Sequence, residues 1–435
     1  MARGARKKTT AQGGRAPKKP LREHRSSARG VSQNGSQDGS STSGADALCP
    51  LAGTCGGCTQ VNTAYEDQLA AKDAFVRALF DDELFAGVVI NPILGMDQPF
   101  HYRNKVASPF APGKRGPYGG RDILTGMYAA GTHRLVPTEN CLLENEQAQQ
   151  VVSAIRALMK KHGVAPYDED RGTGFMRHVV VRVGHESGEV LVTLVTNEEA
   201  FPNSKSFCRE LVRRCPFITT IVQNVNTRQT NVILGDKEQR LYGPGFILDT
   251  LCGLSFRISS KSFYQVNAVQ TTVLYQTAIA LAELDGSQRV IDAYCGTGTI
   301  GLVAAAQGAA EVIGVDSVES AIRDARENAK HNGVENARFF VGDAGAFMRD
   351  LADAGERVDV VLMDPPRAGS SEEFLGAVVQ LAPQRVVYVS CNPQTQQRDV
   401  RYLVKRGYRL KIVQPVDMFP HTDHVETVVL LQKDL

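Results

Sequence analysis

Regular alternation between apolar runs and amphipathic segments dominates the C-terminal part of the chain. Seven short runs rich in β-branched residues are bounded by turn residues, and segments with helical spacing fall between most of them. Such runs are typical of buried strands in a parallel sheet. Their order predicts the α/β class, with a doubly wound, Rossmann-like sheet of seven strands. The expected strands are 289–292, 311–315, 338–342, 358–363, 385–390, 409–416 and 425–431.

Glycines follow the first of these strands, in Asp292-Ala-Tyr-Cys-Gly-Thr-Gly-Thr-Ile-Gly301. They match G-x-G-x-x-G, in which the glycines allow a tight turn against a bound cofactor, and Asp316 ends the second strand, where an acid can bind ribose hydroxyls. The pattern fits a nicotinamide dinucleotide or S-adenosylmethionine (SAM). The acid at position 292 favours SAM, because it can face the cationic end of that cofactor. Asp343 and Asp364, at later strand ends, are expected at the same cofactor site.

A cysteine, Cys391, follows the fifth expected strand, and the fourth strand ends in Asp364-Pro-Pro-Arg. A free cysteine is most often a small buried hydrophobic residue. Cys391, however, falls at the sheet edge where open α/β sheets bind their ligands. The two prolines make the neighbouring loop rigid. Enzymes that methylate base amino groups have a similar acid- or amide-Pro-Pro loop, and the added cysteine indicates a different reaction class.

Carbon-5 of uracil is an acceptor that suits this set of residues. It is a poor nucleophile until a thiolate adds to carbon-6, and its proton must leave after methyl transfer. Cys391 would supply the thiolate and Asp364 a hydrogen-bond partner for the ring. Glu426, which begins the last expected strand, is the candidate base. The alternatives are that Glu426 is a surface carboxylate, or that His421 or His424 is the base.

A second group of cysteines lies far from Cys391, in Cys49-Pro-Leu-Ala-Gly-Thr-Cys55-Gly-Gly-Cys58. The paired glycines allow a tight turn, so that two thiolates can face one centre. Cys141 is the nearest cysteine downstream and the candidate fourth ligand. Four thiolates suit either zinc or an iron–sulfur cluster, and the spacing alone does not decide between them.

Charge is distributed unevenly along the 435 residues. The first 30 residues hold ten of the 49 Lys and Arg but one of the 47 acids, so the remainder is acidic overall. The chain contains no apolar stretch long enough for a membrane span and no signal-peptide core. We therefore expect a cytoplasmic protein without membrane attachment, in which clustered cysteines bind metal or act chemically rather than form disulfides.

Composition and element order divide the chain into four expected regions. Residues 1–46 form a basic, disordered tail, which suits RNA phosphate contacts but also fits a solubilising tail or a transit peptide. Residues 47–141 carry the cysteine cluster and β-hairpins, the first of them at Val88-Val-Ile. Residues 142–257 form a central α/β domain that we expect to bind RNA. Residues 258–435 form the cofactor-binding domain.

Five motifs together resemble the RNA uracil-5-methyltransferases, over about residues 47–435. They are Ser262-Phe-Tyr-Gln265-Val-Asn, Asp292-Ala-Tyr-Cys-Gly-Thr-Gly, Asp364-Pro-Pro-Arg, Val389-Ser-Cys391-Asn-Pro and His424-Val-Glu426. The resemblance implies SAM contacts at Gln265, Tyr294, Asp316 and Asp364, a nucleophile at Cys391 and a base at Glu426. It also implies a [4Fe-4S] cluster on Cys49, Cys55, Cys58 and Cys141, as in the branch of the family that modifies 23S ribosomal RNA.

Two features depart from that family. Many of its rRNA members begin with a small β-barrel RNA-binding domain, where this chain has a basic arm, and its ribose-binding acid is often Glu, where this chain has Asp316. The sequence thus predicts a monomeric, SAM-dependent 23S rRNA uracil-C5 methyltransferase that acts on a single-stranded or flipped uridine. A tRNA substrate is the nearest alternative. A non-catalytic, metal-containing RNA-binding protein comes second, and a nicotinamide oxidoreductase third.

Overall fold

An eight-stranded sheet forms the C-terminal half of the protein in the computed structural model, which describes residues 47–115 and 121–434. The strand order is β1-β16-β17-β15-β14-β11-β12-β13, and β17 is antiparallel to both of its neighbours. The predicted Rossmann-like α/β fold is confirmed, with all seven expected strands present. The strands are β1 (Val89–Ile90), β11 (Arg289–Ala293), β12 (Glu311–Asp316), β13 (Ala337–Val341), β14 (Val360–Met363), β15 (Arg385–Ser390), β16 (Tyr408–Val416) and β17 (Glu426–Lys433).

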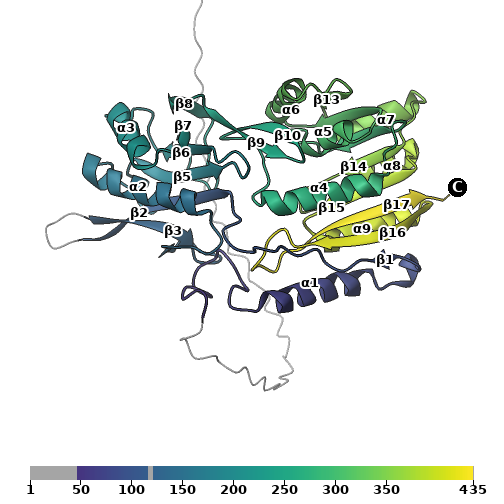
Figure 1. Cartoon of the computed structure of the whole chain (residues 1–435), viewed down its shortest axis with the longest axis horizontal. Helices are drawn as coiled ribbons and strands as arrows, with labels where there is room; N and C mark the ends of the chain where they lie inside the picture. Colours follow the sequence, from purple (N-terminus) through teal and green to yellow (C-terminus); the bar gives the residue numbers. More distant parts are fainter. Residues whose placement is uncertain (1–46, 116–120, 435) are drawn as a thin grey trace, which may run out of the picture. The chain divides into compact units, whose positions relative to one another are not determined.

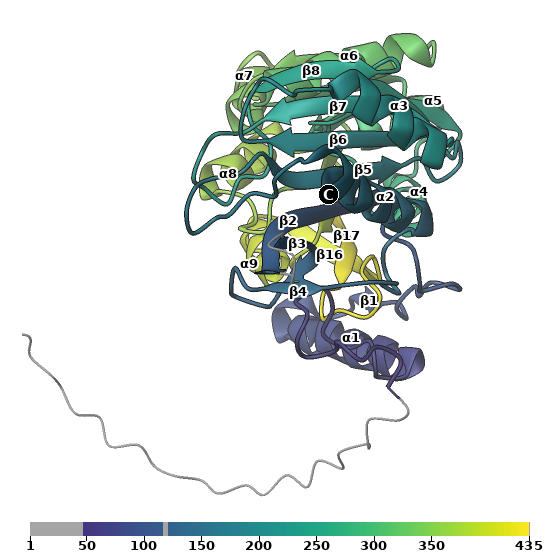
Figure 2. The same ribbon diagram turned by 90° about the vertical axis from the view of Figure 1, so that its left-hand side faces the viewer.

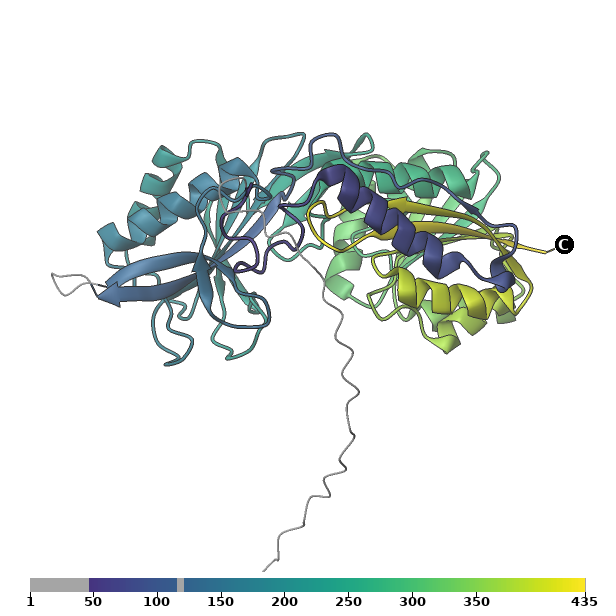
Figure 3. The ribbon, with the colours of Figure 1, turned by 90° about the horizontal axis from the view of Figure 1, so that it is seen from below.

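The eighth strand, β1, corrects one prediction. Its residues were expected in an N-terminal hairpin, but Val89 and Ile90 pair in parallel with Ile412 and Val413 of β16. Helix α1 (Tyr65–Phe80) and the short 3-10 helix η1 (Glu83–Phe85) lead the chain to this edge. Their buried aromatic residues, Phe80 and Phe85, join the same core cluster as the strands β16 and β17. Figure 3 shows α1 beside the yellow strands of this sheet.

Helices cover both faces of this sheet (Figure 1). One face packs against α4 (Ala268–Ala282), α5 (Thr299–Ala306), α6 (Glu319–His331) and the hairpin β9 (Phe246–Leu251) and β10 (Leu254–Ser259). The other face packs against α1, α7 (Ala344–Asp353), α8 (Glu372–Leu381) and α9 (Pro393–Val404). Because both faces are buried, the strands are continuous apolar runs, and their carboxyl ends form the edge at which polar residues gather.

A second, seven-stranded sheet has the order β4-β3-β2-β5-β6-β7-β8. Its strands are β2 (Lys105–Arg115), β3 (Arg121–Tyr128), β4 (Leu135–Pro137), β5 (Met176–Val183), β6 (Val190–Thr196), β7 (Ile218–Val225) and β8 (Lys237–Tyr242). Helices α2 (Glu146–His162) and α3 (Ser204–Arg214) pack on one face, as seen in Figure 2. The boundary expected at residue 141 falls within the span of this sheet, because β2 pairs with β5 across it.

Residues from position 47 onward make up a single compact unit. The basic segment 1–46, for which disorder was predicted, lies outside the described residues. Among the helices that the structure does describe, none has the length and apolar character needed to span a bilayer.

Candidate active site

Cys391 lies directly after β15 and is partly exposed. The Asp364 loop follows the adjacent strand β14 and brings Arg367 close enough to the thiol to act on its pKa. Burial raises the pKa of Cys391 above its usual value, and the carboxylates of Glu426 and Asp364 add to the rise, while Arg367 opposes it. Sequence analysis assigned no role to Arg367, although its place after the Asp-Pro-Pro turn was a signal that a cation would reach the cysteine.

Glu426 begins β17, which pairs with β15 next to Cys391. Its exposed fraction is 4%, so the alternative of a surface carboxylate is wrong. Burial raises the pKa of Glu426 to about 8, and the charge of Asp364 contributes to that rise. Burial also raises the pKa of Asp364, to about 7. Two carboxyl groups with pKa values near neutrality therefore lie close to one thiol, an arrangement that suits proton transfer.

The two histidines considered as alternative bases differ in their surroundings. His421 is buried, and its Nδ1 lies 3.1 Å from the amide nitrogen of Gln68 on α1. Its ring also stacks on Phe100, with 4.6 Å between the ring centres. His421 therefore contributes to packing between the N-terminal segment and the loop before β17. His424 lies at the surface. Partial desolvation of its ring, together with nearby cations such as Arg367, lowers its pKa.

The glycine loop after β11 is held by two aspartates. Asp292 Oδ2 accepts a hydrogen bond from Gly301 N–H at 2.8 Å, and Asp316 Oδ2 accepts one from Gly296 N–H at 2.9 Å. Asp292 is buried beneath the loop, and burial raises its pKa to about 8. It supports the start of α5. From the sequence we expected its carboxylate to face the cationic end of SAM instead. A Cβ at position 301 would lie 2.6 Å from Asp292 Oδ2, so only glycine fits there.

Tyr294 occupies the same loop in a left-handed conformation, with φ of 63°. A bulky residue in this region is strained, and such strain is concentrated at functional sites. Its ring lies 4.9 Å from that of Phe374 on α8, and its pKa is raised by burial and, more weakly, by Asp343. Asp343 caps α7 by accepting a bond from Ala346 N–H at 2.8 Å. Tyr294 and Asp343 are thus close together at the carboxyl edge of the sheet.

The segment before α4 carries Gln265, whose carbonyl accepts a bond from Asn104 Nδ2 at 3.1 Å. Two residues earlier, Phe263 has an exposed fraction of 70%. A phenylalanine this exposed suits stacking against a ligand, a role that sequence analysis did not assign. The signal was the aromatic pair inside the Ser262-to-Gln265 motif.

The four N-terminal cysteines line one cavity of about 100 Å³, together with Arg103. Burial raises the pKa of Cys58 to about 11, and the other three cysteines contribute. Among the residues of the described ranges, however, no group of three or more His, Cys, Asp or Glu side chains is arranged to hold a metal ion. The thiols thus share a cavity, and their chemistry fits a thiolate-bound group, but they do not converge on one ion position.

Comparison with known proteins identifies the family. Residues 284–424 match a family model described as "Methyltransferase domain". A Bacillus cereus protein named "Uncharacterized RNA methyltransferase" is 42% identical over 389 residues, which cover 89% of this chain and 83% of the relative. A similarly named Listeria monocytogenes protein is 42% identical over 385 residues, which cover 88% of this chain and 83% of that one. The chain belongs to the SAM-dependent RNA methyltransferases.

A solved structure extends the comparison to the fold. The Pyrococcus abyssi tRNA (uracil-54, C5)-methyltransferase, in complex with S-adenosyl-L-homocysteine, has a TM-score of 0.70 and 28% identity, over 87% of this chain and 86% of its own. The likeness covers both sheets of this RNA methyltransferase.

Proposed function

We propose that this RNA methyltransferase transfers a methyl group to carbon-5 of a uridine. The observation that carries the proposal is the grouping of a thiol, a cation and two carboxyl groups at one sheet edge. Asp364, Cys391 and Glu426 stand at the ends of the neighbouring strands β14, β15 and β17. Arg367, Asp364 and Glu426 all shift the pKa of the Cys391 thiol. Methylation of an exocyclic amino group or of a ribose hydroxyl requires no nucleophilic cysteine.

In this proposal Cys391, as a thiolate held by Arg367, adds to carbon-6 of the uracil ring. The electron pair of the 5,6 double bond then makes carbon-5 nucleophilic, and SAM supplies the methyl group. Glu426 removes the carbon-5 proton, and the electrons left on carbon-5 re-form the double bond and expel the thiolate. Asp364, kept partly protonated by its raised pKa, can donate a hydrogen bond to a ring carbonyl.

We assign SAM binding to five residues on the carboxyl edge and the segment before α4: Gln265, Tyr294, Asp316, Asp343 and Asp364. Support for Asp316 comes from its position at the end of β12, where its two carboxylate oxygens are oriented by the backbone N–H groups of Gly296 and Val318. The remaining lone pairs can accept bonds from ribose hydroxyls. Support for Tyr294 comes from its strained backbone at the turn of that loop.

We propose 23S ribosomal RNA as the substrate, and the support is the cysteine set that the sequence shares with the rRNA branch of the resembled family. A tRNA substrate is the second candidate, favoured by the Pyrococcus abyssi relative, whose title names tRNA uracil-54. Mapping 5-methyluridine in 23S rRNA and in tRNA, from cells with and without the gene, tests both. Loss of 5-methyluridine from rRNA alone supports the first, and loss from tRNA alone overturns it.

We further propose that Cys49, Cys55, Cys58 and Cys141 hold a [4Fe-4S] cluster. All four thiols line one cavity. In a [4Fe-4S] cluster each thiolate binds a different iron atom, so the four sulfur atoms need not converge on one ion position. Iron and sulfide analysis of anaerobically purified protein, with its visible absorption spectrum, tests this assignment. Zinc in place of iron, or an unchanged iron content in Cys58→Ser, would contradict it.

A further inference from the structure

The seven-stranded sheet carries a cavity on the face opposite to α2 and α3. Val106, Val179 and Val181 of β2 and β5 point into the core shared with these helices. Because side chains alternate along a strand, the residues between them face the other way. Among these are Pro109 and His178, which lie directly opposite each other in the β2–β5 pair and line the cavity.

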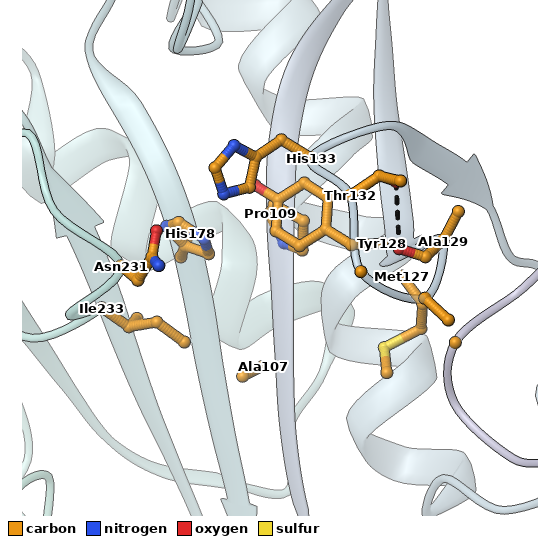
Figure 4. Close-up of a pocket in the computed structure, with 13 residues that line it drawn as sticks. Ala107, Pro109, Met127, Tyr128, Ala129, Thr132, His133, His178, Asn231 and Ile233 are labelled. Atoms are coloured by element: carbon orange, nitrogen blue, oxygen red, sulfur yellow. Dashed lines mark hydrogen bonds between the residues drawn. The ribbon is translucent and has the colours of Figure 1, made fainter. Parts of the chain in front are cut away.

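The walls of this cavity are largely apolar and aromatic. Its volume is about 610 Å³, and Tyr128 and His133 contribute two rings, 6.0 Å apart and nearly edge-on. Pro109, Met127 and Ile233 add apolar surface, as Figure 4 shows. No Lys or Arg among the described residues lines the cavity. Flat, uncharged walls of this kind suit a planar ring better than a phosphate group.

Two polar groups face this apolar surface. His178 has an exposed fraction of 7%, and its Nδ1 has no hydrogen-bond partner among the described residues. Burial and the neighbouring Arg177 lower the pKa of His178 to about 4, which keeps the ring neutral at pH 7. Asn231 lies beside it in Figure 4, and both can donate and accept hydrogen bonds.

We propose that this cavity receives one unpaired nucleobase of the RNA substrate, distinct from the base that is methylated. The rings and apolar side chains would stack on the base, and His178 and Asn231 would bond to its polar edge, as in single-strand RNA recognition. The inference rests on the RNA substrate of the proposed function, and it does not require that the methylated atom be carbon-5.

A pair of cations lies on the same two strands, and one of them contacts Ser262 in the segment before α4. Lys105 and Arg182 lie opposite each other, four residues along the strands from Pro109 and His178, which is about 14 Å. Arg182 is 5% exposed, donates to Ser262 O, and has an unpartnered Nε within the described structure. Neither cation forms an ion pair with a described residue. A backbone phosphate between the two bases would satisfy both cations.

The test separates base contacts from backbone contacts. Binding of the full-length protein to an oligouridylate of about 12 nucleotides is compared with binding to an abasic ribose-phosphate chain of the same length. His178→Ala should reduce the preference for the oligouridylate about fivefold, because a stacked and bonded base is lost. Lys105→Gln should weaken the binding of both the oligouridylate and the abasic chain. It should also reduce the slope of log affinity against log salt concentration by about one, the loss of one phosphate contact.

His185 provides the matched control, because it is an exposed histidine in the turn between β5 and β6. His185→Ala should leave the preference for the oligouridylate unchanged. SAM binding, followed by thermal shift, reports whether each variant is folded. A His178→Ala protein that binds SAM normally and keeps the full preference would overturn the proposal. If His178→Ala does not fold, the exposed Asn231→Ala decides in the same way. A protein that makes no 5-methyluridine, but whose His178→Ala variant loses the base preference, would overturn only the proposed function.

Discussion

The charge of Asp364 acts on Glu426, and together with burial it holds the pKa of Glu426 at about 8. Glu426 is therefore mostly protonated at pH 7 in the free protein, and the thiol of Cys391, whose pKa is also raised, carries its proton as well. The mechanism needs Glu426 as a base and Cys391 as a thiolate. The fraction of protein in that state, and with it the rate of methylation, therefore increases with pH.

The rate of methylation should therefore depend on pH. Single-turnover methylation should rise with pH from about 6 to 8, by roughly tenfold per unit for each group that must lose its proton. Above the pKa of Glu426 the rise should become shallower and continue until the thiol of Cys391 has also ionised. Asp364→Asn removes the neighbouring charge, so the rise should move to lower pH even though the rate falls. A flat profile, or an unmoved midpoint in Asp364→Asn, would contradict the assignment of Glu426.

Glu426→Gln should stabilise the protein as it removes activity. A buried carboxyl group whose pKa is raised binds its proton more tightly in the folded state than in the unfolded state. Folding therefore loses stability as pH rises from about 4.5 toward 8. Glutamine cannot ionise, so the variant should gain roughly 1–3 kcal/mol more at pH 8 than at pH 5. Urea unfolding at both values measures this, and the exposed Glu335→Gln should show no such pH-dependent gain.

Arg367 should control the reactivity of Cys391. Its guanidinium opposes the rise in the thiol pKa, so Arg367→Ala should slow alkylation of Cys391 by iodoacetamide about tenfold at pH 8. Mass spectrometry of the Cys391 peptide distinguishes this thiol from the other eight cysteines. Arg349→Ala, which removes an exposed arginine on α7, is the matched control. Equal alkylation rates in the two variants would show that Arg367 does not act on the thiol.

Gly301→Ala should damage the glycine loop. The new methyl group would lie 2.6 Å from Asp292 Oδ2 and force the loop or the buried strand end to shift. We expect at least about a tenfold loss of SAM affinity, measured by calorimetry, with a lower melting temperature. In Gly376→Ala the nearest atom is Tyr402 Oη at 3.5 Å, and the change to alanine favours the helix α8. SAM affinity that is equal in both variants would count against the role given to the loop.

The sequence predicted those parts of the fold that have a local signal. The apolar run from Arg385 to Ser390 was found because its length, its β-branched residues and the turn residues that bound it all agree. Strand β1 was misplaced because two residues have no period, and its partner β16 lies near the other end of the chain. The nucleobase cavity could not be predicted, since it depends on the register that sets His178 against Pro109. The burial of Glu426 likewise comes from neighbours on both sides in the sheet.

The central claim is a covalent bond between Cys391 and carbon-6 of a uracil ring. RNA that contains 5-fluorouridine tests it directly, because fluorine cannot leave carbon-5 as a proton does, and the thioether would persist after methyl transfer. With SAM present, the wild-type protein should form a protein–RNA adduct that survives denaturing electrophoresis, with its attachment mapped to the Cys391 peptide. Cys391→Ala should form none. Absence of the adduct from wild-type protein that methylates unmodified RNA, or an adduct on another residue, would contradict the account.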